Sequence, residues 1–283
     1  MLVRLQGISM WLSMAALTGA TVLYAYFFLS KKTLHSRYAT ALTGAGFVLL
    51  TASIGMYSSA AQGTRLVGPY TLVLAAWALV FVYFVVEHLV KLKVYGTVLV
   101  PVALALLVLA QILLPAAAGL KPTVEEVRLL DSWRVIVHVV LIVFANAGFA
   151  IGAAASGTYL ALEAQLKRHR TTTLFKRLPS LAQTDLVARR AVGWAYPAYS
   201  AGLLLGVLRA VETDVTGWWQ DPRVMLAGLV WAIFGAYLYL HYGREASGRT
   251  SAYVALAGLV FVVALAIVAR TVPAGFHIFG IAG

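Results

Sequence analysis

Residues 138–167 read HVVLIVFANAGFAIGAAASGTYLALEAQLK. This run is apolar over more than the about 20 residues that a helix needs to cross a bilayer. Its small residues recur at intervals of three or four and share one stripe of a helix: Ala145, Gly148, Gly152 and Ser156. Such stripes let membrane helices pack closely. At about 1.5 Å per residue, His138 and Glu163 would lie roughly 37 Å apart, so we expect the helix to cross the membrane and extend beyond it.

The composition of the whole chain agrees with a membrane protein. Of its 283 residues, 61% are hydrophobic and 11% are charged, and the mean hydropathy is +0.87. Soluble domains are closer to half apolar and a quarter charged. The chain contains no cysteine, which excludes disulfides, thiolate metal ligands and cysteine nucleophiles.

Eight stretches are long and apolar enough to span a membrane. Lys, Arg, Gly or Pro residues separate them, and none alternates with the period of two expected of a barrel strand. The predicted spans are 8–29, 39–60, 68–90, 94–114, 133–162, 189–210, 223–242 and 250–270. The sequence therefore predicts an all-α, polytopic integral membrane protein, with one domain covering residues 1–283 and about eight helices in one bundle. The first span is interpreted as a retained helix and not as a signal peptide, since no clear small-residue cleavage site follows it.

The distribution of positive charge gives an orientation. One set of loops holds 14 of the 22 Lys and Arg residues, and the other set holds six of the ten acidic residues. Loops rich in Lys and Arg face the cytoplasm, which predicts a cytoplasmic (inner) membrane protein with both termini outside. The formal charge of +12 is then a consequence of topology and does not indicate nucleic acid as a partner. Membrane lipid is the expected surrounding, and the basic loop 167–190 could contact anionic headgroups.

This topology brings three separate segments to the outer face. They are His138, the loop Gly217-Trp-Trp-Gln-Asp-Pro-Arg223, and His277 near the carboxyl terminus. Two neutral imidazoles can ligate haem iron, and indole rings can pack on a porphyrin. Cations would suit the haem propionates, and the outer candidates are Arg134, Arg209, Arg223 and Arg270.

Several segments resemble one known family. Residues 138–167 are similar to a histidine-bearing helix and its exit, and Leu178-Pro-Ser-Leu181 with Asp185-Leu186 resembles a short cytoplasmic connector. Trp219, Asp221 and Pro222 resemble the end of a tryptophan-rich "WWD" segment, and Gly275-Phe-His277 resembles a second external histidine. The chain thus resembles the cytochrome c assembly (CcsA/CcmC/HemX-like) family over roughly residues 65–280.

The resemblance implies a haem b site. His138 and His277 would be the axial ligands of the iron, and Trp218, Trp219 and Asp221 would cradle the porphyrin. The tryptophan segment is shorter than in the family's ligases, and Asp221-Pro-Arg-Val224 with the compact length is closer to the HemX-type branch. The implied function is haem handling in cytochrome c maturation or haem homeostasis, beside other membrane proteins of a cytochrome assembly or respiratory system. The chain is not expected to be a catalyst alone; it could form part of a haem–apocytochrome c ligation system.

Other interpretations stay open at this point. The alternative function is a structural or electron-transfer subunit of a membrane complex that kept the family fold. Trp218 and Trp219 also suit an interfacial aromatic belt, and His138 could be a hydrogen-bonded interfacial residue. Asp221 before Pro222 is a good helix start, with Asp as N-cap and Pro at the first position.

The remaining histidines suggest a weaker hypothesis. His88 and His241 fall near the cytoplasmic ends of their spans and are interpreted as snorkelling interfacial residues, although the family can carry an inner histidine pair at a haem entry site. No Ser/His/Asp arrangement, metal-hydrolase spacing or phosphate-binding Gly loop occurs in the sequence.

Overall fold

The computed structural model describes residues 2–30, 33–60, 70–90, 93–117, 132–168, 178–243 and 248–271. Within these ranges the chain is helical and contains no strand, and eight helices are long and apolar enough to cross a membrane. The long helices are α1 (Leu2–Ser30), α2 (Thr33–Ala60), α3 (Tyr70–Val90), α4 (Gly96–Ala117), α6 (Trp133–Lys167), α7 (Leu181–Glu212), α8 (Pro222–Leu238) and α9 (Gly248–Thr271). The predicted all-α bundle of eight membrane helices is confirmed.

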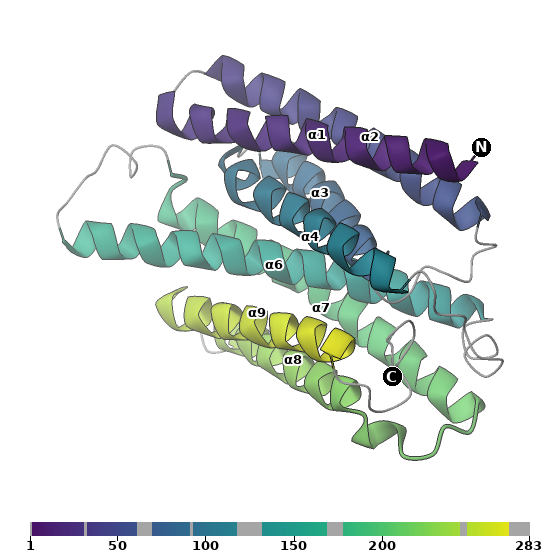
Figure 1. Ribbon diagram of the computed structural model, residues 1–283. Helices are drawn as coiled ribbons and strands as arrows, with labels where there is room; N and C mark the ends of the chain where they lie inside the picture. Colours follow the sequence, from purple (N-terminus) through teal and green to yellow (C-terminus); the bar gives the residue numbers. More distant parts are fainter. Residues whose placement is uncertain are drawn as a thin grey trace.

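Helix α6 lies between two groups of helices (Figure 1). On one side it packs against α3, and α1, α2 and α4 complete that group. On the other side it packs against α7 and α9, and α8 covers both of these helices. Buried side chains of α6 belong to the hydrophobic cores of both groups. The 35-residue helix that contains the small-residue stripe is therefore the element shared by the whole bundle.

The small residues of α6 are the points where α7 comes closest. A Cβ atom added at Gly148 would lie 2.8 Å from Cβ of Ala195, and one added at Gly152 would lie 2.7 Å from Cγ2 of Val192. Both distances are too short for a side chain larger than hydrogen, so the two glycines set the separation of the helices. The tight packing expected from the sequence is confirmed.

The boundaries differ most at α7. The sequence predicted a span that begins at 189, whereas the helix begins at Leu181. Ser180 accepts a hydrogen bond from the backbone of Gln183, whose side chain accepts one from the backbone N–H of Ser180. This capping box starts the helix in a polar segment, and a search for apolar spans does not detect such a start.

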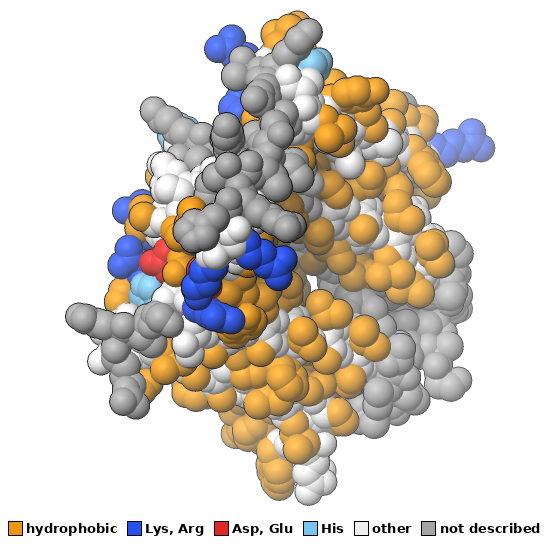
Figure 2. Space-filling view, turned by 90° about the vertical axis from the view of Figure 1, so that its left-hand side faces the viewer, with side chains coloured by type: hydrophobic (Ala, Val, Ile, Leu, Met, Phe, Trp, Pro, Cys, Tyr) orange, Lys and Arg blue, Asp and Glu red, His pale blue; other side chains and the backbone are white. Residues whose placement is uncertain are grey.

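The two ends of the α6–α9 group carry different polar residues. We call the end where α6 begins the His138 end and the end where α7 begins the Asp185 end. The amino terminus of α1 lies towards the His138 end (Figure 1). Figure 2 looks onto the opposite side of the molecule and shows Lys and Arg side chains gathered there beside a broad hydrophobic surface.

Candidate functional site

The His138 end is built from the start of α6, the end of α7 and the segment that leads into α8. Ser132 is the N-cap of α6 and accepts a hydrogen bond from the backbone N–H of Arg134. This cap fixes the first turn of α6 and places His138 one turn further along the helix. Since α6 and α7 run in opposite directions (Figure 1), His138 faces the last turns of α7.

The ring of His138 is held by the backbone of α7. Its Nδ1 lies 2.7 Å from the carbonyl oxygen of Gly202. A carbonyl only accepts, so Nδ1 carries the proton and the lone pair of the neutral ring is on Nε2. A Cβ atom added at Gly206 would lie 2.9 Å from both Cε1 and Nδ1 of His138. The carbonyl group of Gly202 and the missing side chain of Gly206, one turn apart on α7, therefore hold the imidazole against the helix backbone.

The connection from α7 to α8 carries the two tryptophans. Gly217, with φ of +70°, precedes the short 3₁₀ helix η3 (Trp218–Gln220); a left-handed conformation of this kind favours glycine. The rings of Trp218 and Trp219 meet edge to face, with centroids 5.8 Å apart and planes at 83°. Trp219 is 58% exposed, so one large aromatic surface remains accessible beside the start of α8.

Asp221 is the N-cap of α8, as predicted, and Pro222 occupies the first turn. Oδ1 of Asp221 accepts a hydrogen bond of 2.8 Å from the backbone N–H of Arg223 and lies 3.7 Å from Nη1 of Arg223. Asp221 and Arg223 are both buried. The carboxylate thus starts the helix and pairs with a buried cation, which favours a structural role over direct contact with a porphyrin.

The other two arginine candidates share one carboxylate. Arg134 on α6 pairs with Oε1 of Glu212, and Nη1 of Arg209 lies 3.8 Å from Oε2 of Glu212. The guanidinium of Arg134 also lies 5.5 Å from the ring centroid of Trp133. Glu212 at the end of α7 therefore brings the two arginines together, and its carboxylate offsets part of their positive charge.

Two predicted residues cannot be placed. His277, the second predicted axial ligand, lies outside the described residues, as does the side chain of Arg270. The structure thus brings together His138, Arg134 and Arg209 between α6 and α7, and Trp218, Trp219, Asp221 and Arg223 before and at the start of α8.

One polar pair was missed by the sequence analysis. His241 lies in the π-helical turn η4 (Tyr239–Gly243) at the Asp185 end, and its Nε2 is 3.8 Å from Oδ2 of Asp185. Its side chain is only 12% exposed and stacks on Tyr237. The interpretation of His241 as a snorkelling residue is therefore wrong, because helix packing covers the ring; His88 is exposed, as expected.

A family model and several curated proteins are similar to this chain. The family model described as "Cytochrome C assembly protein" matches residues 68–277. Similar curated proteins include the "Cytochrome c biogenesis protein CcsA" of Guillardia theta, 25% identical over 232 residues that cover 74% of each chain. The protein of the same name from Prochlorococcus marinus (strain MIT 9303) is 26% identical over 231 residues, or 72% of each chain.

Proposed function

Because this chain belongs to the cytochrome c assembly protein family, we propose that it handles haem in cytochrome c biogenesis and holds haem b at the His138 end. The named function of its relatives, cytochrome c biogenesis, supports the process. HemX-like haem homeostasis is the second use to which the same site would be suited.

The main support for the proposal is the tautomer and orientation of the His138 ring. Histidines that ligate metals usually donate their other ring N–H to a carbonyl or carboxylate, which fixes the tautomer and the orientation of the ring. His138 donates Nδ1–H to Gly202 in this way, so Nε2 is the nitrogen that would bind iron. The bound haem would supply an iron centre whose ligands decide whether it is held or passed on.

The other candidate residues of the His138 end fit the rest of a haem to different degrees. Trp218 and Trp219 offer apolar rings for the porphyrin, one of them well exposed. Arg134 and Arg209 are suitably charged for propionates, but a propionate would compete with Glu212 for them. Buried Arg223 already lies beside Asp221, so it suits a propionate less well.

We place this site on the extracytoplasmic side of a cytoplasmic membrane, with both termini outside. The excess of Lys and Arg in the opposite loops supports this orientation. His277, which follows α9, would reach the same side and serve as the second axial ligand. Other membrane proteins of the assembly system would be the partners.

The test is the absorption spectrum of detergent-purified protein after haem supplementation. Wild type is compared with His138→Ala and His277→Ala, and His35, whose Nδ1 lies 3.1 Å from the hydroxyl group of Ser30, supplies the control His35→Ala. We expect a Soret band that both outer substitutions remove or shift and that the control keeps. A Soret band that is indifferent to both outer substitutions would refute this site. Protein without haem that copurifies stoichiometrically with membrane partners would favour a structural subunit instead.

A further inference from the structure

The Asp185 end contains a polar cavity that the proposed haem site does not use. Four helices contribute to it: α6, α7, α8 and α9. Its lining consists of Ser156, Tyr159, Asp185, Ala188, Tyr237, Gly248, Ser251 and Ala252. The capping box at Ser180 starts α7 just before the cavity, and Asp185 follows one turn later. The connector motif therefore has a structural consequence, which is to bring a carboxylate into this cavity.

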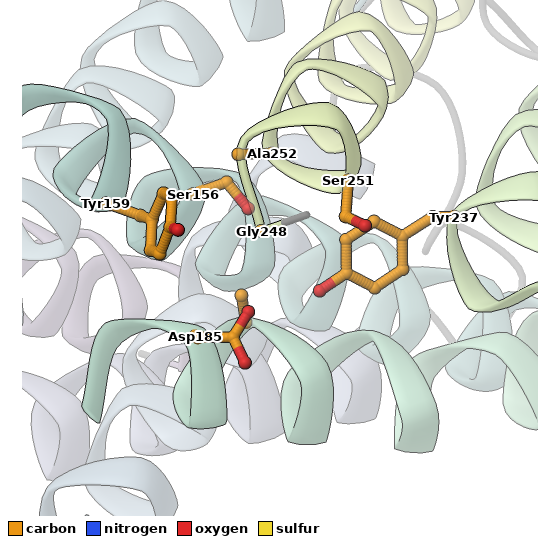
Figure 3. Close-up of a pocket in the computed structure, with 8 residues that line it drawn as sticks. Ser156, Tyr159, Asp185, Tyr237, Gly248, Ser251 and Ala252 are labelled. Atoms are coloured by element: carbon orange, nitrogen blue, oxygen red, sulfur yellow. The ribbon is translucent and has the colours of Figure 1, made fainter. Parts of the chain in front are cut away.

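Oxygen atoms converge on the cavity from several sides. Figure 3 shows the Asp185 carboxylate between the hydroxyl groups of Tyr159 and Tyr237, which point inwards from opposite sides. Nearby, Oδ2 of Asp185 also lies 3.8 Å from Nε2 of His241.

Two polar atoms near this carboxylate have no hydrogen-bond partner among the described residues. Ser251 is 2% exposed, and its Oγ has no partner within the described part of the chain; the same holds for Nδ1 of His241. A buried polar atom without a partner costs about 1–3 kcal/mol, so native structures usually satisfy it with protein or with ordered water. Ser251 lines the cavity, so a molecule in the cavity can satisfy it.

The size of the cavity limits that molecule. Its volume is about 10 Å³, which is close to the smallest space that holds one water molecule with two to four polar partners. Gly248 and Ser251 belong to the first turn of α9, where backbone N–H groups lack partners within the helix. The positive end of a helix disfavours a metal cation here, whereas water can accept from such groups and donate to a carboxylate.

We propose that this cavity is a binding site for one ordered water molecule, which joins the Asp185 carboxylate to the Ser251 hydroxyl, and that the hydrated carboxylate positions the imidazole of His241. Ser251 is then a positioning residue that acts on His241 through the water and Asp185. The π-helical turn brings His241 to this carboxylate, and π-bulges are frequent at functional sites. The site lies at the opposite end of α6 from His138 and does not depend on haem.

The first measurement compares two buried hydroxyl groups that both lack partners among the described residues. Ser251→Ala removes the hydroxyl that lines the cavity, and Tyr70→Phe removes one in α3 away from it. If water satisfies Ser251, its loss lowers the thermal unfolding temperature by about 2–4 °C, while Tyr70→Phe leaves it unchanged or raises it. An unchanged or raised temperature for Ser251→Ala would overturn the proposal.

The second measurement reads His241 directly. In protein with ¹⁵N-labelled histidine, the ring signals of His241 are assigned by their loss in His241→Gln. We expect Asp185→Asn and Ser251→Ala to shift both ring nitrogens and Tyr70→Phe to shift neither. If the His241 ring signals do not change in Ser251→Ala, no water links Ser251 to Asp185. An unfolding temperature that rises when sodium replaces N-methylglucamine at equal ionic strength, only while Ser251 is present, would identify a cation and also overturn the proposal.

Discussion

The His138 end and the Asp185 end of the α6–α9 group differ in the contacts that their polar side chains make. At the His138 end, described partners are close at hand: His138 bonds to Gly202, Arg134 and Arg209 share Glu212, and Asp221 caps α8. At the Asp185 end, a carboxylate faces a cavity, and Ser251 and His241 each keep a buried atom without a described partner.

On our proposals, the protein's own contacts hold the side chains at the His138 end, whereas one water molecule completes the contacts at the Asp185 end. At the His138 end, described residues fix the orientation of the His138 ring and the start of α8, as the proposed haem site requires. At the Asp185 end, Oγ of Ser251 and Nδ1 of His241 have no hydrogen-bond partner among the described residues, and the adjacent cavity has room only for a small molecule. Substitutions should therefore act differently at the two ends.

The largest effect on stability is expected from Asp221→Ala. This change removes the N-cap of α8 and the carboxylate beside buried Arg223. Loss of a cap costs about 1 kcal/mol, and loss of one partner of a buried ion pair costs more, so we expect the free energy of unfolding to fall by about 3 kcal/mol. Asp221→Asn keeps a capping oxygen and should cost clearly less in a denaturation experiment. Equal losses would mean that the capping oxygen contributes nothing beyond the charge of Asp221.

The second-largest effect is expected at the contact between α6 and α7, midway between the His138 end and the Asp185 end. A Cβ atom in Gly152→Ala would lie 2.7 Å from Cγ2 of Val192, so α6 and α7 must separate or repack at a cost of about 1–3 kcal/mol. Gly55→Ala is the matched control, because nothing lies within 4 Å of its added Cβ and alanine favours a helix. The thermal unfolding temperature should fall for Gly152→Ala and stay the same or rise for Gly55→Ala. An unchanged unfolding temperature for Gly152→Ala would mean that this contact does not constrain the separation of α6 and α7.

A smaller change should act on the His138 end alone. In Gly206→Ala the new Cβ would lie 2.9 Å from the His138 ring, which must turn away from its bond to Gly202. We expect haem affinity to fall about tenfold, or about 1.4 kcal/mol, with little change in unfolding. Gly193→Ala on the same helix meets only the hydroxyl of Tyr242 at 4.0 Å and should bind haem normally. Normal haem titration of Gly206→Ala would contradict the assigned role of His138.

The smallest effect is expected from Glu212→Gln. This change removes the carboxylate with which a propionate would compete at Arg134 and Arg209. Glu212 is partly exposed, so solvent screening limits the gain to less than about 1 kcal/mol. Haem affinity should rise a few-fold at low salt and lose the gain at high salt. A fall in affinity would show that Glu212 supports the site by placing the arginines.

The local features of this fold could be predicted from the sequence, and the contacts between distant segments could not. Hydropathy indicated eight spans, and the pair Asp221-Pro222 indicated the start of α8. The early start of α7 was missed because Ser180 and Gln183 act through hydrogen bonds and not through hydropathy. The bond from His138 to Gly202 joins residues 64 positions apart, so only the packing of α6 on α7 determines it.

The contact between Asp185 and His241 is equally non-local. The sequence near either residue does not indicate that the two side chains are close. Hydropathy and the motifs considered above also do not indicate the π-helical turn that brings them together. His277 stays a prediction, since it lies outside the described residues.

The continuity of α6 has an evolutionary consequence. His138 and Ser156 are eighteen residues apart, which is about five full turns at 3.6 residues per turn, so both lie on one stripe of the helix. Inserting one residue between them would rotate one end by about 100° relative to the other. His138 could then not contact Gly202 while Ser156 still lines the Asp185 cavity. The helix should therefore tolerate many substitutions on its other faces, whereas its length between these two positions should be fixed among functional descendants.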